Sequence, residues 1–379
     1  MSGLAVVAGE SPLPATSGLR QRILHLTRAL ASAFDVELLA LGDVPAADGE
    51  PFSLRGVPHD RSRVAALLRS VRAPYEAAKV RSPRLEQLLT AGNWATVQAE
   101  LPFVARAALA ARVPLVLDAH NIEADVLATL ARTDSRAAHR VRWRWESVKT
   151  AAYERRVMAA AAAVCTTSDA DAASAERLGS RRTVVVPNGV DCAAIEHRQP
   201  ARTAQLAYVG HFGYRPNVLA AVELVDQVLP RVRAEVPDAG LVLVGRDPGA
   251  DLRAREGAAV TVAADVPDVL PYLHRSRALV VPLRSGGGTR LKVLEAFAAG
   301  VPVVSTPFGV AGLDVRDGQD VLLADSAAEL AAQCVRLLRE DGLAASLSER
   351  GRALAESRYD WAVVARPLVE LHADLGRLR

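Results

Sequence analysis

Residues 280–295 read Val-Val-Pro-Leu-Arg-Ser-Gly-Gly-Gly-Thr-Arg-Leu-Lys-Val-Leu-Glu, an order that predicts a buried strand, a glycine bend and a helix beginning near Thr289. Glycine has no Cβ atom, so its backbone approaches a ligand closely and adopts positive φ. The first turn of a helix presents unpaired N–H groups and the positive end of the helix dipole, and both favour a phosphate. The stretch therefore predicts a phosphate site at a strand-to-helix turn.

Two cations and a carboxylate follow the glycines. Arg290 and Lys292 add two positive charges at the turn, and Lys292 is one of only three lysines in the chain. Residues two apart diverge on a helix, so Arg290 is expected in the end of the loop or the opening turn. Lys292 and Glu295 are three apart and share a helix face, which suits Glu295 to accept hydrogen bonds from ribose hydroxyls. The alternative is a glycine-rich turn with solvated charges.

Around this stretch, short apolar segments alternate with helical patterns such as 19–33 and 146–160. Strands are predicted at 4–9, 36–41, 94–99, 114–118, 162–167 and 183–187, and then at 205–210, 241–245, 259–263, 278–283, 302–305 and 321–324. This repeated β-α pattern predicts an α/β fold class with two Rossmann-like, doubly wound domains facing each other. A ligand is expected between them, at the carboxyl ends of the strands.

The domain boundaries follow from the same pattern. A length of 379 residues suits two α/β domains. The polar, aperiodic residues 196–203 predict a linker between a first domain over 1–195 and a second over 204–357. A last helical segment is expected over 358–379.

The composition excludes several classes of protein. The net charge of +3 argues against nucleic-acid binding, which requires a concentrated basic face. Three scattered cysteines predict free thiols in a reducing compartment, and no apolar run is long enough to span a bilayer. The N-terminus resembles a first strand more than a signal peptide, so we expect a cytoplasmic protein. The glycines form neither a dinucleotide fingerprint nor a P-loop, which argues against an oxidoreductase or an ATPase.

Two further segments have alternative interpretations. Asp169-Ala170-Asp171 has the form of a metal-binding D-x-D motif, but we expect helix capping here because Thr167 and Ser168 precede a helical run. Residues 132–156 hold eight Arg or Lys against three acidic residues, together with Trp143 and Trp145. A solvated, salt-bridged helix pair is the favoured interpretation, and docking of an anionic membrane or of a phosphorylated acceptor is the alternative.

Residues 282–306 closely resemble the donor-binding region of the group 1 glycosyltransferases, which are retaining enzymes of the GT-B fold that use nucleotide-sugars. The resemblance extends over most of the chain, through 187–191, 208–210 with 215–217, 118–121 and 12–22. Residues 359–361 resemble the start of the family's final helix, which implies that the C-terminal helix crosses back to the first domain.

The resemblance implies the remaining site residues. His120 would lie beside the donor sugar and act with Arg290, Lys292 and Glu295 as the catalytic group. The other donor-binding residues that it implies are Gly18, Gly210, Arg215, Gly286, Gly287, Gly288 and Thr289. Two departures stand out: Gly287 occupies the position of the family's first glutamate, and His211 and Pro216 replace its usual Arg and Lys. The sequence therefore resembles the branch in which a G-G-G-T-R-x-K segment supplies the phosphate cations.

These observations predict a metal-independent, retaining glycosyltransferase without a cofactor. Its donor would be a UDP-, GDP- or dTDP-sugar, and its acceptor an unidentified hydroxyl of a small molecule or glycan. Cations and N–H groups stabilise a leaving diphosphate by preorganised electrostatics. A sugar-nucleotide epimerase of the same fold and a non-catalytic nucleotide-sugar-binding protein are the alternatives, because fold alone does not decide function.

Overall fold

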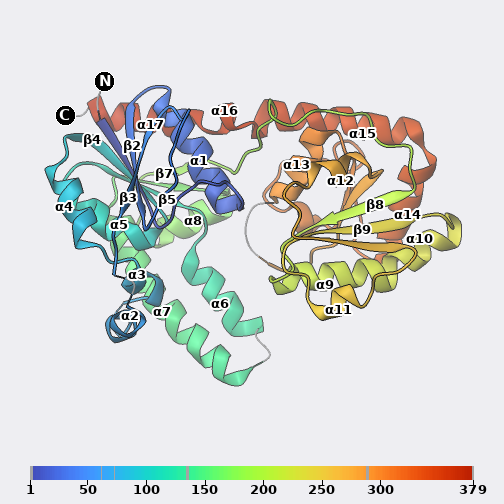
Figure 1. The fold of residues 1–379 in the computed structure, drawn as a ribbon, viewed down its shortest axis with the longest axis horizontal. Coiled ribbons are helices and arrows are strands. Elements are labelled where there is room, and N and C mark those ends of the chain that lie inside the picture. Colours follow the sequence, from blue (N-terminus) through green and yellow to red (C-terminus); the bar gives the residue numbers. More distant parts are fainter. Residues whose placement is uncertain (1–2, 61, 72, 134–135, 287–289, 378–379) are drawn as a thin grey trace. The chain divides into compact units, whose positions relative to one another are not determined.

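The structure, a computed structural model, describes residues 3–60, 62–71, 73–133, 136–286 and 290–377. The chain forms two compact units, one of Met1–Asn188 with Val364–Arg379 and the other of Gly189–Val363 (Figure 1). Each unit is a parallel sheet with helices packed against it, as the β-α repeat predicted. The predicted site residues Gly287, Gly288 and Thr289 lie outside the described residues.

The sheet of the first unit has seven strands in the order β3-β2-β1-β4-β5-β6-β7. Every neighbouring pair is parallel. The strands are β1 (Gly3–Ala8), β2 (Asp35–Leu41), β3 (Ser53–Val57), β4 (Trp94–Glu100), β5 (Leu115–Ala119), β6 (Ala163–Thr166) and β7 (Thr183–Val185). The chain reverses its direction of travel across the sheet between β1 and β4, so the crevice beyond their carboxyl ends is the expected ligand position.

The helices of this unit begin with α1, which Ser17 caps by accepting a hydrogen bond from the backbone N of Arg20. They are α1 (Gly18–Ala31), α2 (Arg63–Arg69), α3 (Tyr75–Lys79), α4 (Pro83–Ala91), α5 (Pro102–Ala108), α6 (Glu123–Thr133), α7 (Ala137–Ala160), α8 (Asp169–Arg177) and α17 (Arg366–Arg377). The last helix, α17, therefore belongs to the unit that contains the N-terminus. The 175 residues of the other unit, Gly189–Val363, separate it in sequence from Asn188.

Two elements of this unit differ from the sequence prediction. The edge strand β3 was not predicted, because Ser53-Leu-Arg-Gly-Val57 is short and only its last residue is fully buried. Helix α7 begins at Ala137, before the periodic pattern 146–160 and inside the segment 132–156 where a helix pair was expected. No described side chain between 137 and 149 is buried, so the core-facing period that marks a helix in sequence begins only in its second half.

The sheet of the second unit has six parallel strands in the order β10-β9-β8-β11-β12-β13. They are β8 (Gln205–Val209), β9 (Gly240–Gly245), β10 (Val260–Ala264), β11 (Ala278–Val281), β12 (Val303–Ser305) and β13 (Leu322–Leu323). The strand order reverses between β8 and β11. The glycine-rich turn that follows β11 therefore starts at the expected ligand crevice of this sheet.

The helices of this unit are α9 (Arg215–Glu223), α10 (Leu229–Glu235), α11 (Ala250–Arg253), α12 (Leu270–His274), α13 (Leu291–Ala299), α14 (Ala327–Arg339) and α15 (Asp341–Leu354). Helix α16 (Trp361–Val364) spans the boundary between the two units. Residues 189–203 pack with this unit, although the polar stretch 196–203 had suggested a linker. Val190 donates to the carbonyl of Tyr359, and Arg352 donates to the carbonyls of Cys192 and Ile195. None of the described helices has the length and apolar character needed to cross a bilayer.

Candidate functional site

The loops that follow β8 and β9 approach each other closely in the second unit. A Cβ atom added at Gly245 would lie 1.7 Å from the carbonyl oxygen of Gly210, and one added at Gly210 would meet the Asn217 side chain at 3.0 Å. Gly286, at the start of the glycine bend, has φ +114°. Glycine adopts a positive φ without strain, whereas other residues are strained in this conformation. The glycines thus allow the loops after β8 and β9 to approach each other closely at the carboxyl edge of the sheet.

Arg290 is the residue that immediately precedes α13. Its side chain is buried, with 6% of its surface exposed, and its Nε and Nη2 atoms donate to the carbonyl oxygen of Phe308 at 3.3 and 3.2 Å. The guanidinium also lies over the Phe308 ring, 4.9 Å from its centre. Burial lowers the pKa of Arg290, but a guanidinium stays charged in proteins. A fixed positive charge therefore stands at the N-terminus of α13, in the last loop position that the sequence predicted.

Lys292, in the first turn of α13, points toward β8. Its Nζ atom donates to Asn217 Oδ1 at 3.0 Å and to the Tyr208 hydroxyl at 3.2 Å, and lies 4.3 Å from the centre of the Tyr208 ring. Burial, and then the charge of Arg290, lower the pKa of Lys292 to about 7, against a smaller opposing effect of Glu295. An ammonium with this pKa would gain strongly from an anion beside it.

The structure thus brings Arg290 and Lys292 together where the strand order reverses. Arg215, another predicted donor-binding residue, is the first residue of α9 and is exposed. Glu295 lies one turn after Lys292 on α13 and is half-buried. Tyr208 and Asn217 were not predicted individually, although both lie in the segments that carried the family resemblance. The sequence features that could have identified them are a tyrosine inside a predicted strand and an amide in the first turn of the next helix.

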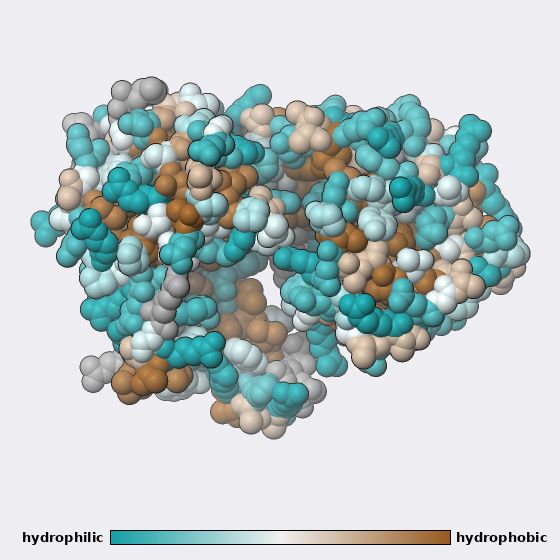
Figure 2. Space-filling model, viewed as in Figure 1, coloured by the Kyte–Doolittle hydropathy of each residue, from teal (hydrophilic) through white to brown (hydrophobic). Residues whose placement is uncertain are grey.

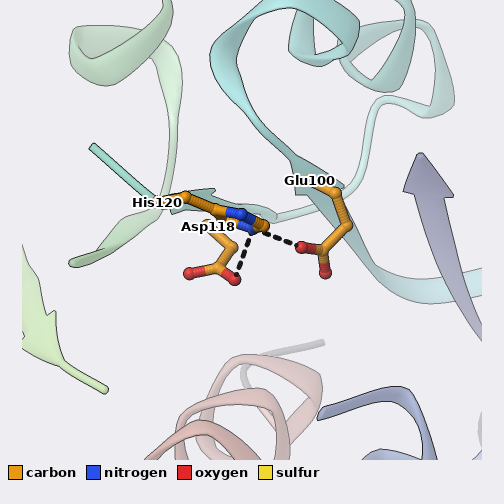
Figure 3. A group of neighbouring side chains, drawn as sticks. All are labelled: Glu100, Asp118 and His120. Carbon is orange, nitrogen blue, oxygen red and sulfur yellow. Dashed lines mark hydrogen bonds and ion pairs between the residues drawn. The ribbon is translucent and has the colours of Figure 1, made fainter. Parts of the chain in front are cut away.

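In the first unit, His120 lies directly after β5 and contacts two carboxylates (Figure 3). Its Nε2 atom is 2.8 Å from Glu100 Oε2, at the end of β4, and 3.2 Å from Asp118 Oδ2, on β5. The described residues offer its Nδ1 atom no partner. The carboxyl ends of neighbouring parallel strands meet at one edge of the sheet, which explains why the three residues converge.

A fourth member of this cluster, Arg22 on α1, was not predicted. It is 1% exposed and binds Asp118 with two hydrogen bonds, Nε to Oδ2 at 2.8 Å and Nη2 to Oδ1 at 2.6 Å. Its Nη1 atom donates to Asn188 Oδ1 at 3.0 Å and to the carbonyl of Pro187 at 3.2 Å. Arg22 therefore joins three segments that resembled the family separately: 12–22, 118–121 and 187–191. The predicted Gly18 is the first residue of the same helix.

Electrostatics fix the charge states in this cluster. Burial alone would lower the pKa of His120, but Asp118 and Glu100 outweigh it and raise that pKa to about 9. Burial and the charge of Asp118 raise the pKa of Glu100. Burial also acts to raise the pKa of Asp118, but Arg22 and His120 hold it well below its usual range. At neutral pH His120 is therefore an imidazolium, a hydrogen-bond donor at both ring nitrogens.

A buried polar chain continues from Glu100 to α17. Gln98 Nε2 donates to Glu100 Oε1 at 2.6 Å, and Gln98 Oε1 lies 2.9 Å from His372 Nε2. Burial lowers the pKa of His372 to about 3, so its ring is neutral. Since an amide oxygen only accepts, His372 carries its proton on Nε2, and its Nδ1 atom accepts from the Thr96 hydroxyl at 2.8 Å. Every second residue of β4 from Thr96 to Glu100 thus belongs to one network.

The Asp-x-Asp segment forms the first turn of α8, which Ser168 caps. Ser168 Oγ accepts from the backbone N of Asp171, and Asp171 Oδ2 in turn accepts from the hydroxyls of Ser168 and Thr167. This confirms the capping interpretation at α8. Among the described residues, the set with metal-ligand spacing is instead Glu100, Asp118 and His120.

Comparison with known proteins identifies both units. Residues 17–189 match the family described as glycosyl transferase 4-like domain, and residues 203–340 match glycosyl transferases group 1. Over 212 residues the chain is 30% identical to a glycogen synthase of Mycobacterium tuberculosis, which covers 52% of this chain and 50% of the synthase. The chain thus spans about half the length of this curated relative.

Solved structures show the fold. A sucrose-phosphate synthase from Thermosynechococcus elongatus superposes with a TM-score of 0.74 at 19% identity, over 100% of both chains. Anabaena HepE, solved in complex with UDP and glucose, gives 0.71 at 14% identity over 98% of this chain and 99% of its own. The fold is therefore GT-B, and the chain combines a glycosyltransferase 4-like domain with a group 1 glycosyltransferase domain.

Proposed function

We propose that the protein is a retaining glycosyltransferase that moves a sugar from a nucleoside diphosphate to a hydroxyl acceptor without a metal ion. One observation carries this proposal: Arg290 and Lys292 converge at the N-terminus of α13, where the strand order of the second sheet reverses. The UDP bound to the structurally similar HepE supports a nucleoside diphosphate as the ligand class.

The chemistry requires that the leaving diphosphate be stabilised as the anomeric carbon becomes cationic. Arg290 supplies a charge that is already fixed by Phe308, and Lys292 supplies one held by Tyr208 and Asn217. Charged donors that are positioned in advance need no reorganisation during the reaction, so they stabilise the developing negative charge efficiently. The N–H groups at the start of α13 add the positive end of the helix dipole.

The proposed transfer breaks the bond between the anomeric carbon and the phosphate oxygen and forms one to the acceptor oxygen on the same face. As the family resemblance implies, the leaving phosphate accepts the acceptor's proton. Glu295 is assigned to the ribose hydroxyls, and Gly18, Gly210 and Gly286 to close approach of backbone. His120 is assigned to the donor sugar, as a hydrogen-bond donor through Nδ1, because both carboxylates engage Nε2.

The charge pattern around His120 supports metal-independent transfer. The guanidinium of Arg22 binds both oxygens of Asp118, and the imidazolium of His120 lies against both carboxylates. A divalent cation at this cluster would have to displace the guanidinium of Arg22 from Asp118 and a proton from His120. The stabilising charge is therefore assigned to Arg290 and Lys292.

The test has two steps. A thermal-shift screen of UDP-, GDP- and dTDP-sugars identifies the donor, and a transfer assay with that donor and a panel of sugar and polyol acceptors follows in EDTA. A new glycoside with retained anomeric configuration supports the proposal. Dependence on added manganese contradicts metal independence, and an epimerised donor without acceptor indicates the epimerase. Stabilisation by a donor without any reaction across the panel indicates a non-catalytic binding protein.

A further inference from the structure

The large apolar side chains of helix α2 face solvent instead of the core of the unit. Val64, Leu67 and Leu68 on this helix, and Val71 two residues after its end, follow the spacing i, i+3, i+4 and i+7, yet they are 59–72% exposed. Ala66 is its one buried residue. A stripe with this spacing normally packs against a neighbour. Figure 2 shows hydrophobic side chains gathered over this helix, at the lower left.

Helix α7 carries a second exposed apolar stripe. Val141, Trp145 and Val148 share one face and are 60–72% exposed. Together with the stripe of α2 they make seven of the ten large hydrophobic side chains that are exposed in the described part of the chain. A concentration of this kind marks an interaction surface, whereas single exposed hydrophobic residues are ordinary.

The two helices are joined to each other. Lys149 of α7 donates from Nζ to the carbonyl oxygen of Ser70, at the end of α2, at 2.6 Å. Glu146 of α7 accepts from the backbone N of Tyr75, which begins α3, at 3.2 Å. The two stripes therefore lie on two hydrogen-bonded segments of the same unit. We call them together the α2–α7 surface: Val64, Leu67, Leu68, Val71, Val141, Trp145 and Val148.

The charges around the stripe of α7 are positive. Arginines flank it on the exposed side of the helix: Arg140, Arg142, Arg144, Arg155 and Arg156. The two acidic residues of α7 are turned inward. Glu154 is fully buried and accepts from the backbone N atoms of Glu123 and Ala124, and Glu146 pairs with Lys149 at 2.5 Å. The outer face of α7 is thus apolar at its centre and basic along its edges.

We propose that the α2–α7 surface docks on an anionic lipid bilayer. Exposed aliphatic and tryptophan side chains enter the boundary between headgroups and acyl chains, and flanking arginines bind anionic headgroups. The exposed charged side chains beside the stripe of α7 are arginines and its two acidic residues are engaged within the unit, so the charge of this surface complements an anionic bilayer. The inference is independent of the proposed function, because it uses no residue assigned to the donor site.

The experiment is vesicle flotation of the full chain at low salt. The probes are vesicles of phosphatidylcholine and phosphatidylglycerol in equal parts, and vesicles of phosphatidylcholine alone. We expect flotation with the anionic vesicles only, and release as salt screens the charges. L67N/L68N abolishes flotation, and R142Q/R144Q weakens partitioning by roughly 30-fold, since each arginine near the surface contributes about fivefold.

The controls remove similar side chains elsewhere. L219N takes an exposed leucine from α9, and R350Q takes an exposed arginine from α15, and both variants should float like the parent. All four altered positions of the test variants are exposed, so the variants should keep the parent's melting temperature. Absence of flotation, or equal flotation of the test variants, overturns the proposal. Self-association without lipid that L67N/L68N abolishes overturns it in favour of a second copy of the chain.

Discussion

The ammonium group of Lys292 donates to the hydroxyl of Tyr208 and lies over the same ring, 4.3 Å from its centre. Tyr208 belongs to β8, and Lys292 belongs to α13, the helix that follows β11. The contact therefore joins the two strands between which the strand order reverses. Tyr208 and Asn217 fix the position of the charge, while burial destabilises it. The site is therefore preorganised for an anion, and this relationship underlies the first two predictions.

Replacing Lys292 by Met removes the charge and keeps most of the side-chain volume. We expect turnover to fall by about two to three decades, the usual effect of losing one positioned donor to a developing negative charge. Initial rates with saturating donor measure this. K79M is the matched control, because Lys79 is exposed and pairs with Glu76 on its own helix. Near-parental turnover of K292M would refute the assignment.

The depressed pKa of Lys292 predicts pH-dependent donor binding. With a pKa of about 7 in the free protein, Lys292 loses its proton above neutrality, and a bound diphosphate must restore it. Donor affinity should therefore fall as pH rises from 7 to 9, by at most about tenfold per pH unit. Both phosphates of a nucleotide-sugar keep their charge over this range. Calorimetric titration of K292M should show a much shallower profile, in which the His120 pKa of about 9 leaves only a small fall. A flat profile in the parent would contradict the pKa of Lys292.

The lowered pKa of Lys292 also predicts how the free energy of unfolding depends on pH. Because the pKa of Lys292 is lowered from its value of 10.5 in the unfolded chain to about 7, the unfolded state binds more protons between these values. The contribution of Lys292 to the free energy of unfolding therefore rises with pH over this window. Urea unfolding of the parent and K292M at pH 7 and 9 measures it. The advantage of K292M over the parent should shrink as pH increases, and a constant difference would speak against the shift.

The contribution of His120 to the free energy of unfolding should fall as pH rises, whereas that of Lys292 rises. Its pKa is raised from 6.5 to about 9, so the stability that it contributes is complete below pH 6.5 and is lost as pH rises through 9. Nuclear magnetic resonance of ring-labelled histidine reports the charge directly, and H120Q identifies the resonance. We expect an imidazolium signal at pH 7.5. A midpoint near 6.5 would mean that Glu100 and Asp118 do not hold the proton.

Arg22 should be essential for the stability of the first unit. Replacing it by Met leaves Asp118 buried without its bidentate partner, which should cost about 3–5 kcal/mol in the free energy of unfolding. R28M on the same helix is the control. Arg28 pairs with Glu50 but is 40% exposed, and such pairs contribute at most about 1 kcal/mol. Equal losses in the two variants would contradict the role of burial.

The sequence predicted the sheets well, because buried parallel strands are continuous apolar segments. Strand β1 shows why: Leu4 to Ala8 are all buried, so no alternation obscures the pattern. Strand β3 does not form a continuous apolar segment, because it lies at the edge of the sheet and only its last residue is fully buried. The periodic pattern 146–160 covered only the second half of α7, since the apolar face of the first half is turned outward and does not continue the core-facing period.

The candidate site was predictable where the chemistry is local in sequence. Arg290, Lys292 and Glu295 lie within six residues, so helical geometry alone relates them. The His120 cluster was only partly accessible, because Arg22 and Asp118 are 96 residues apart and Glu100 stands on a neighbouring strand. An arginine in a helix normally predicts an exposed side chain. Only the fold shows that this one neutralises a buried carboxylate.

A crystal structure with an intact nucleotide-sugar tests the central claim most directly. We predict that the diphosphate lies within hydrogen-bond distance of the Arg290 guanidinium and of Lys292 Nζ, at the N-terminus of α13. A nucleotide bound elsewhere, with residues 286–292 facing bulk water, would contradict the account.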